Sequence, residues 1–305
     1  MKKTYELPAT KFILERLEIP KGTLNMVLDT DTYNEIDDQF ALVHALTSPD
    51  RLNVQAVYAA PFSNDRAATP GEGMEKSYDE IQRVLERLRL PAKPVVLKGA
   101  GRYLGSTETP VDCPAVQDLI RRARASAEPL YVVAIGAITN IASAILLEPS
   151  IVSKIVVVWL GGHAHYWPDT KEFNLMQDVP AAQVVFDSGV PVLQVPCLPV
   201  ASHLTTSVQE LDHHIRGKSA IGDYLAGIFR EYQDKRKRMA KEIWDVAAIA
   251  VLLNPEWTPA DLVHSPVVGE RLVYSRDDRR HLIKCVRWIH RDAVFADLFA
   301  KIARG

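Results

Sequence analysis

LNMVL (Leu24–Leu28) and DTDTYNEIDD (Asp29–Asp38) stand side by side near the start of the chain, so that an apolar run turns directly into a cluster of carboxylates. An apolar run without polar alternation is typical of a strand that is buried on both faces of a parallel sheet. Helical spacing follows over Asp37–Thr47 and completes a strand–turn–helix unit. This unit predicts an α/β fold with the carboxylates at the carboxyl end of its first strand.

The same alternation continues to about residue 199. Five further runs rich in Val, Ile and Leu are interpreted as parallel strands: Val54–Ala59, Pro94–Leu97, Leu130–Ile135, Ile155–Leu160 and Val190–Val195. The segments between them have helical spacing: Gly73–Leu88, Cys113–Ser126, Ile138–Leu147 and Val179–Ser188. Together they predict an open, mostly parallel, Rossmann-like sheet with helices on both faces.

The last third of the chain has a different pattern. We expect helices near Ser207–Ile215, Ser219–Lys235 and Lys241–Leu253, and late strands at Leu262–Val268 and His281–Ile289. These elements indicate a helical cap over the sheet, within about residues 200–305. Because no internal repeat or low-complexity linker divides the sequence, residues 1–305 are interpreted as one domain.

Composition restricts the partners. The net charge of −2 gives no long-range field that would gather nucleic acid or an anionic membrane, so a small molecule is the expected partner. Three scattered cysteines without CxxC spacing indicate neither a disulfide framework nor a zinc site. The N-terminal residues form no apolar signal core and no run is long enough to span a membrane, which predicts a cytoplasmic location.

The aspartates at 29, 31, 37 and 38 are the strongest chemical signal. Carboxylates so close together repel one another unless a cation or a helix N-terminus offsets their charge. An all-oxygen ligand set suits Ca²⁺ or Mg²⁺ rather than zinc. The alternative is that Asp37 or Asp38 caps the helix while the others lie in a solvated turn.

With its neighbours, this cluster resembles the DxDxxxDD-type signature of the inosine-uridine nucleoside hydrolase family. Further segments resemble that family in order and spacing across about residues 24–255: AVYAAPFSN (Ala56–Asn64), AIGAITNIA (Ala134–Ala142), Leu160-Gly161-Gly162, Glu172-Phe173-Asn174 with Asp178, and IWDVAAIA (Ile243–Ala250). Each motif is weak alone, but together in register they identify the chain as similar to this family.

The resemblance implies Ca²⁺-dependent hydrolysis of the N-glycosidic bond of a ribonucleoside or related ribosyl compound, and a homodimer or homotetramer. It implies that Asp31 is both general base and metal ligand, with Asp38, Asp245 and the main-chain carbonyl of Ile135 as the other ligands. Asn174 and Trp244 are implied as further catalytic residues. The implied substrate-binding residues are Asp37, Asn64, Leu160, Glu172, Asn174 and Trp244, and Asp29 is implied to support the cluster from behind.

The chain departs from the family pattern at three places. Five residues separate Asp31 from Asp37 where the family usually has three, so Asn34 or Glu35 adds a contact, the pocket is reshaped, or the loop is a harmless bulge. GGHAHYWPDT (Gly161–Thr170) lacks an asparagine that many members use for the sugar, and its histidines or Asp169 are possible substitutes.

Trp244 is the third departure, because many members have there a histidine that is proposed to protonate the leaving base. The tryptophan indicates stacking on a base and a preference for purines, unless it is core packing. The nearby charge run KRKRMAK (Lys235–Lys241) is interpreted as a solvated face or a mobile loop edge.

Two alternatives remain open at this stage. LDTDT (Leu28–Thr32) also fits the DxDxT of haloacid dehalogenase-like phosphatases, in which Asp29 would be the nucleophile and Mg²⁺ the ion. The longer loop and the missing histidine also fit a divergent member that acts on another glycoside, or that binds a sugar or nucleoside without turnover.

Overall fold

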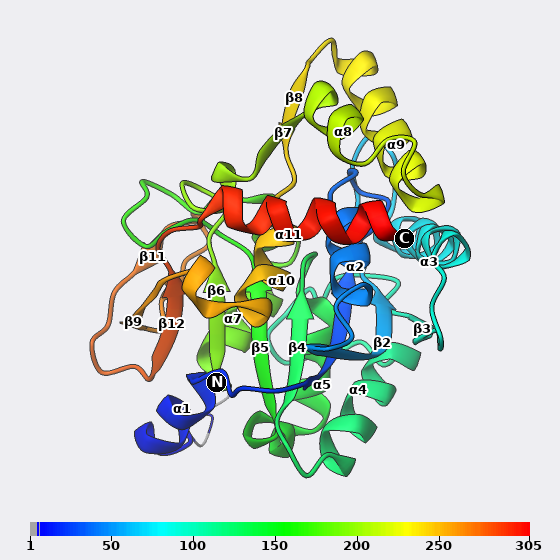
Figure 1. Cartoon of the computed structure of the whole chain (residues 1–305). Helices are drawn as coiled ribbons and strands as arrows, with labels where there is room; N and C mark the ends of the chain where they lie inside the picture. Colours follow the sequence, from blue (N-terminus) through cyan, green and yellow to red (C-terminus); the bar gives the residue numbers. More distant parts are fainter. Residues whose placement is uncertain (1–4, 6) are drawn as a thin grey trace.

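An eight-stranded sheet forms the centre of the computed structural model, which describes Tyr5 and residues 7–305 (Figure 1). Its strand order is β3-β2-β1-β4-β5-β6-β12-β9, and only β9 is antiparallel to its neighbour. The strands are β1 (Leu24–Thr30), β2 (Leu52–Ala59), β3 (Val95–Lys98), β4 (Leu130–Ala134), β5 (Ile155–Leu160), β6 (Val192–Val195), β9 (Ala260–His264) and β12 (Leu282–Val286). The predicted mostly parallel α/β sheet is confirmed.

Helices cover both faces of the sheet because successive strand residues point to opposite sides. Met26 and Leu28 face one hydrophobic core and Val27 faces the other. The first core is shared with α1 (Thr10–Leu17), α2 (Asp38–Leu46), α3 (Pro70–Arg87), α10 (Val246–Leu253) and α11 (Arg291–Arg304). The second is shared with α4 (Pro114–Ala125), α5 (Thr139–Leu147) and α7 (Val179–Asp187).

The direction of strand succession reverses at β1. The chain passes from β1 to β2 and β3 on one side, and β4 then pairs with β1 on its other side. Such a reversal leaves a crevice beyond the carboxyl ends of the two central strands, where ligands bind in open α/β sheets. The loops after β1 and β4 therefore meet at the natural place for a site.

A small group of elements projects beyond the end of the sheet to which β4 and β5 point (Figure 1). It contains α8 (Val208–His214), α9 (Ala220–Arg236) and the antiparallel pair β7 (Thr205–Ser207) and β8 (Ala240–Glu242). We call it the cap. The expected helices near residues 207–215 and 219–235 are both present in it.

The predicted helix Lys241–Leu253 was wrong in its first part. Residues 240–242 form β8, which pairs with β7 in the register Thr206↔Lys241, and α10 begins only at Val246. The predicted strand Leu262–Val268 is also interrupted, because β9 ends at His264 and Val267–Val268 (β10) pairs instead with Tyr274–Ser275 (β11).

Several elements were not predicted. They are helices α1, α6 (Phe173–Gln177) and α11, and the short 3-10 helices Pro149–Ser153, Ala201–His203 and Pro255–Trp257. Within the part of the chain that the structure describes, no helix combines the length and apolarity needed to cross a membrane.

Candidate active site

One cavity of about 350 Å³ gathers the residues predicted for the site. Asp31 enters it from the end of β1, Ile135 from the end of β4 and Leu160 from β5. The other predicted residues that line it are Asp37, Asp38, Asn64, Glu172, Asn174, Trp244 and Asp245. Residues more than 200 positions apart in the sequence thus converge on one volume, which is large enough for a small-molecule ligand.

Buried carboxylates form the floor of this cavity. Oxygen atoms of Asp37, Asp38 and Asp245 lie within 4.8 Å of one another. Burial, and then the charges of its aspartate neighbours, raises the pKa of Asp245 well above its usual range. The pKa of Asp38 is raised to about 7 by burial and by Asp37, although Thr30 Oγ1 donates a 2.5 Å hydrogen bond to its Oδ1. We call Asp31, Asp37, Asp38 and Asp245 the carboxylate cluster.

Asp31 is the member whose two carboxylate oxygens are both buried and unpartnered among the described residues. It is fully buried, and neither Oδ1 nor Oδ2 has a hydrogen-bond partner among the residues that the structure describes. Its pKa is raised by burial and by the charges of Asp38 and Asp37. Gly136 leaves just enough space for it, since a Cβ at position 136 would lie 3.0 Å from Asp31 Cγ.

A divalent cation fits these observations. Unpartnered buried carboxylate oxygens are costly unless a charge of opposite sign lies nearby. The donors of Asp31, Asp38, Asp245 and the Ile135 carbonyl are all oxygen, which is the ligand type that Ca²⁺ and Mg²⁺ prefer. The three carboxylates whose oxygens lie within 4.8 Å of one another are those of Asp37, Asp38 and Asp245, so Asp37 is available as a further ligand.

Asp29 lies behind the cluster. Its Oδ1 accepts a 2.7 Å hydrogen bond from Asn140 Nδ2, and the side-chain oxygen of Asn140 in turn accepts one from the backbone N–H of Ala100. Burial raises the pKa of Asp29 to about 7. Asp29 is not among the residues that line the cavity. The position of Asp29 therefore fits a residue that supports the cluster better than it fits the accessible nucleophile that a phosphatase needs.

Asn174 and Glu172 form the opposite wall. Asn174 Nδ2 donates to the carbonyls of Ile135 at 3.1 Å and Leu160 at 3.0 Å, so one amide ties together the ends of β4 and β5. Glu172 caps α6, because its carboxylate accepts from the backbone N–H groups of Asn174 and Leu175. The carbonyl of Ile135 keeps a second lone pair for another partner.

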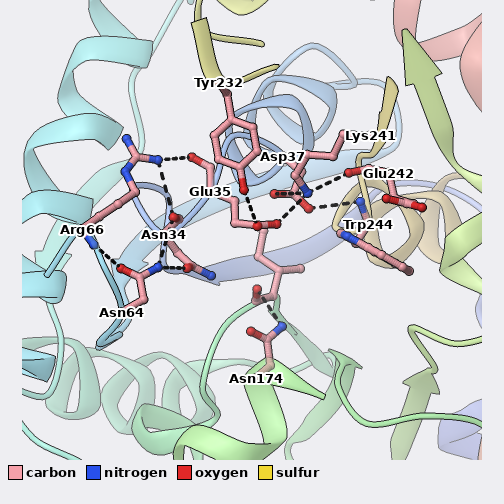
Figure 2. Close-up of polar contacts among 11 residues, drawn as sticks. Asn34, Glu35, Asp37, Asn64, Arg66, Asn174, Tyr232, Lys241, Glu242 and Trp244 are labelled. Atoms are coloured by element: carbon pink, nitrogen blue, oxygen red, sulfur yellow. Dashed lines mark hydrogen bonds and ion pairs between the residues drawn. The ribbon is translucent and has the colours of Figure 1, made fainter. Parts of the chain in front are cut away.

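The longer loop after Asp31 forms a third wall (Figure 2). Asn64 Nδ2 donates to Asn34 Oδ1 at 2.7 Å, and Arg66 Nη1 donates to the backbone carbonyl of Glu35 at 2.7 Å. Both Asn34 and Glu35 line the cavity. The extra residues are therefore tied to the segment after β2 and add side chains to the site.

Glu35 is neutralised by the cap. Tyr232 Oη donates to Glu35 Oε1 at 2.5 Å and Lys241 Nζ donates to Oε2 at 2.6 Å (Figure 2). Burial alone would raise the pKa of Glu35, but the charge and hydrogen bond of Lys241 and the hydroxyl of Tyr232 outweigh it and lower this pKa. Lys241 Nζ also lies 4.0 Å from Asp37 Oδ1.

The interpretation of residues 235–241 as a solvated face was wrong for Lys241, whose side chain is only 9% exposed. Lys235 to Met239 are exposed as expected. Lys241 differs because it occupies β8, whose pairing with β7 turns this side chain inward. The signal that could have shown this is the alternation of exposed and buried side chains within the short strand β8.

Trp244 and His163 occupy the remaining wall. The backbone N–H of Trp244 donates to Asp37 Oδ2 at 3.1 Å, which links the tryptophan to the carboxylate cluster. His163 Nδ1 accepts from the backbone N–H of Leu198 at 3.2 Å, so Nε2 carries the proton of the neutral ring. Burial lowers the pKa of His163. His165 does not line the cavity and contacts Gln194 instead.

Solved structures share this fold. The chain superposes on a purine-preferring ribonucleoside hydrolase from Gardnerella vaginalis with a TM-score of 0.73, 20% identity, and coverage of 92% of this chain and 98% of that one. A plant nucleoside hydrolase, PpNRh1, gives a TM-score of 0.72 at 19% identity and covers 92% of this chain and 99% of its own.

Sequence comparison extends the likeness to the family. A pyrimidine-specific ribonucleoside hydrolase RihA from Klebsiella pneumoniae (strain 342) is 32% identical over 267 residues, which are 76% of this chain and 80% of that protein. The protein of the same name from Escherichia coli (strain K12) is 29% identical over 262 residues, with the same coverages. Residues 26–296 match the sequence model of the inosine-uridine preferring nucleoside hydrolase family. The chain therefore belongs to the inosine-uridine preferring nucleoside hydrolase family and is an N-glycosyl hydrolase by that membership.

Proposed function

We propose that this protein hydrolyses the N-glycosidic bond of a ribonucleoside in a Ca²⁺-dependent reaction that releases free ribose and the base. The observation that carries the proposal is Asp31, a fully buried carboxylate in the substrate cavity with both oxygens unpartnered among the described residues. A carboxylate in this state is ready to accept protons from water and to contact a cation. Family membership supports the reaction.

The residues divide the reaction between them. When bound to Asp31, Asp38, Asp245 and the Ile135 carbonyl, Ca²⁺ would supply positive charge that offsets the carboxylates and helps to orient water. Asp31 then takes a proton from the water that attacks the anomeric carbon. As the bond to the base breaks, its electron pair passes to the base nitrogen. The surrounding carboxylates stabilise the oxocarbenium-like sugar.

The sugar is placed by the walls of the cavity. Asp37 and the side-chain oxygen of Asn174 hold ribose hydroxyls, while Asn64 and Glu172 orient the water and the 5′ end. The hydrogen bonds that fix Asn174 to two strand ends support this role, because a fixed amide loses little freedom when the substrate binds.

The preferred base is a separate question with two indications. Trp244 lines the cavity and offers a large aromatic face, which favours stacking on a purine. The RihA relatives are named as pyrimidine-specific. The Trp244→Ala variant decides between them: we expect it to lower kcat/KM for purine nucleosides more than for pyrimidine nucleosides, whereas an equal loss would contradict stacking selectivity.

Ribose release tests the function directly. Purified protein is incubated with inosine, guanosine, adenosine, uridine and cytidine, with added Ca²⁺ and after chelation, and free reducing sugar is measured. We expect Ca²⁺-dependent release from at least one nucleoside. Tight binding of a nucleoside without any sugar release would identify a binding protein and overturn the catalytic proposal.

A further inference from the structure

We propose that His163 determines the specificity for the sugar, by donating a hydrogen bond from its Nε2–H to the 5′ oxygen of the bound ribose. The proposal rests on the N-glycosidic hydrolysis proposed above and adds a residue to it. Three features carry it: the place of His163 in a loop that departs from the family pattern, the fixed tautomer of its ring, and the carboxylate of Glu172 on the same wall.

The loop Gly161–Thr170 supplies a single side chain to the cavity. Of its residues, all of which the structure describes, only His163 is part of the lining. His165 turns away, because its Nε2 lies 2.8 Å from Gln194 Oε1. Asp169 also lies outside the lining, and its side chain is 36% exposed. Of the three substitutes for the missing asparagine that the sequence left open, His163 is therefore the one that faces the cavity.

The ring of His163 is held in one orientation and one tautomer. Its Nδ1 accepts a 3.2 Å hydrogen bond from the backbone N–H of Leu198, and its ring packs edge to face with Trp167, with ring centroids 6.3 Å apart. The neutral ring therefore holds its one proton on Nε2. No described residue accepts this N–H, and Nε2 is not a fully buried atom. A fixed donor is thus open to the cavity.

Free donors are scarce in this cavity. Its lining is rich in carboxylates, which accept hydrogen bonds from sugar hydroxyls but cannot donate to the hydroxyl oxygens. The amide N–H groups of Asn64 and Asn174 are both engaged, with the longer loop and with two strand ends. Three further residues carry donors on other sides of the cavity: Asn34 in the longer loop, Lys171 with an exposed side chain, and Trp244 next to Asp37.

Glu172 identifies the part of the substrate that His163 meets. The backbone N–H of Gly162, the residue before His163, donates to Glu172 Oε2 at 2.8 Å. The Gly162 carbonyl accepts from the backbone N–H of Cys197, and the next residue, Leu198, anchors the His163 ring. His163 and Glu172 therefore share one hydrogen-bonded wall of the cavity. In the proposed reaction this wall faces the 5′ end of the ribose.

The 5′ hydroxyl needs both an acceptor and a donor. In the proposed reaction Asp31 acts at C1′, and Asp37 and Asn174 hold ring hydroxyls, so the 5′ hydroxyl is the one that remains. It can donate to Glu172, whose Oε1 has only the backbone N–H of Asn174 among its described partners. Its own oxygen then still lacks a partner, and an unpartnered buried polar atom is costly. The Nε2–H of His163 supplies that partner.

The test compares uridine with 5′-deoxyuridine, and inosine with 5′-deoxyinosine, for the Ca²⁺-loaded full chain. The variant is His163→Asn, because its amide oxygen can replace Nδ1 as the acceptor for Leu198, whereas no atom of it replaces Nε2. We expect it to lower kcat/KM about tenfold for the nucleosides with a 5′ hydroxyl, and by less than about twofold for their 5′-deoxy analogues. The thermal midpoint should stay that of the wild type, because Leu198 keeps its partner.

Two further variants separate the donor from the rest of the side chain. His163→Gln carries an amide N–H near the place of Nε2, so it should keep the wild-type ratio of kcat/KM between hydroxyl and deoxy substrates. His165→Asn, in the same loop but outside the lining, should keep this ratio as well. Equal losses for both kinds of substrate in His163→Asn, or a lost ratio in His163→Gln, would overturn the role of His163 and leave the proposed function standing. Ribose release from none of the nucleosides would overturn both.

A second measurement uses the wild type. In protein labelled with ¹⁵N-histidine, the Nε2–H signal of His163 is assigned by its absence in His163→Gln. Methyl β-ribofuranoside should shift this signal at concentrations that inhibit ribose release, and methyl 5-deoxy-β-ribofuranoside should not. A signal that responds equally to both sugars, or to neither, would contradict the hydrogen bond.

Discussion

The carboxylate cluster and Glu35 are neighbours in the same cavity, yet they balance their charge in opposite ways. Glu35 has a lysine and a tyrosine hydroxyl from the cap on its two oxygens. Asp31 has neither, and its neighbours are other carboxylates. The difference teaches that acidity alone does not indicate a metal site. A metal site is indicated instead by a buried carboxylate for which the chain supplies no hydrogen-bond or ion-pair partner.

The largest expected effect comes from removing the unpartnered carboxylate. Asp31→Asn keeps the shape of the side chain but removes the base, and we expect ribose release to fall by roughly 10²–10⁴-fold or more. Because the variant also removes a buried, unneutralised charge, its folded structure should persist, as measured by circular dichroism. Asp79→Asn, an exposed position on α3, is the matched control. Full activity in the Asp31 variant would contradict the mechanism.

Metal removal probes the other half of the comparison. If the cluster relies on an external cation, adding Ca²⁺ to chelated protein should raise the temperature of the thermal midpoint. The free energy of unfolding should increase by about 2.7 kcal/mol when Ca²⁺ is at 100 times its Kd. Asp245→Asn should abolish most of this shift, while Glu35→Gln should retain it. A midpoint that does not respond to Ca²⁺ would argue against the cation site.

The pH dependence of stability sharpens the same contrast. In the metal-free protein, burial raises the pKa values of Asp29 and Asp38 to about 7. Because the folded state favours the protonated form of these two carboxyl groups, their contribution to stability is complete below the pKa of the unfolded state, about 4. This contribution is lost as the pH rises through the folded-state pKa of about 7. We expect the free energy of unfolding of chelated protein to decrease from pH 5 to pH 8. Saturating Ca²⁺ should reduce that decrease, and identical slopes with and without Ca²⁺ would exclude this account.

The smallest effect is expected from the internally balanced group. Lys241→Met leaves Glu35 without its cation and should cost about 1–2 kcal/mol of stability, less than for a fully buried pair because Glu35 is partly exposed. Lys235→Met, an exposed position earlier in the same charge run, should change the denaturation midpoint very little. Equal midpoints for the two variants would show that the ion pair adds no stability.

Most of the parallel sheet could be predicted from sequence because its strands are continuous apolar runs separated by helices. Short elements depend on partners that a single sequence does not display, as β8 shows by pairing with β7. Helix α11 is a different case, since its buried residues Val294, Phe295, Leu298, Phe299 and Ile302 have a helical period. That signal was present and was overlooked.

The candidate site was predictable where it follows strand ends. Asp31, Ile135 and Leu160 lie at the carboxyl edge because parallel strands place their ends together. The partnership of Glu35 with Lys241 was not predictable, because it joins residues 206 positions apart and makes an apparently solvated lysine a buried one. Sequence analysis located the loop insertion but not its counter-charge.

Gly136 has a consequence for how this enzyme tolerates mutation. Its backbone is not in the left-handed region, so the fold itself accepts a side chain there, but any Cβ would press on Asp31 and force it to shift by a few tenths of an ångström. In a deep mutational scan, substitutions at this position should therefore leave cellular abundance normal but impair turnover. Selection against substitutions at residue 136 would act on catalytic activity, and a survey that measures stability alone would record these substitutions as neutral.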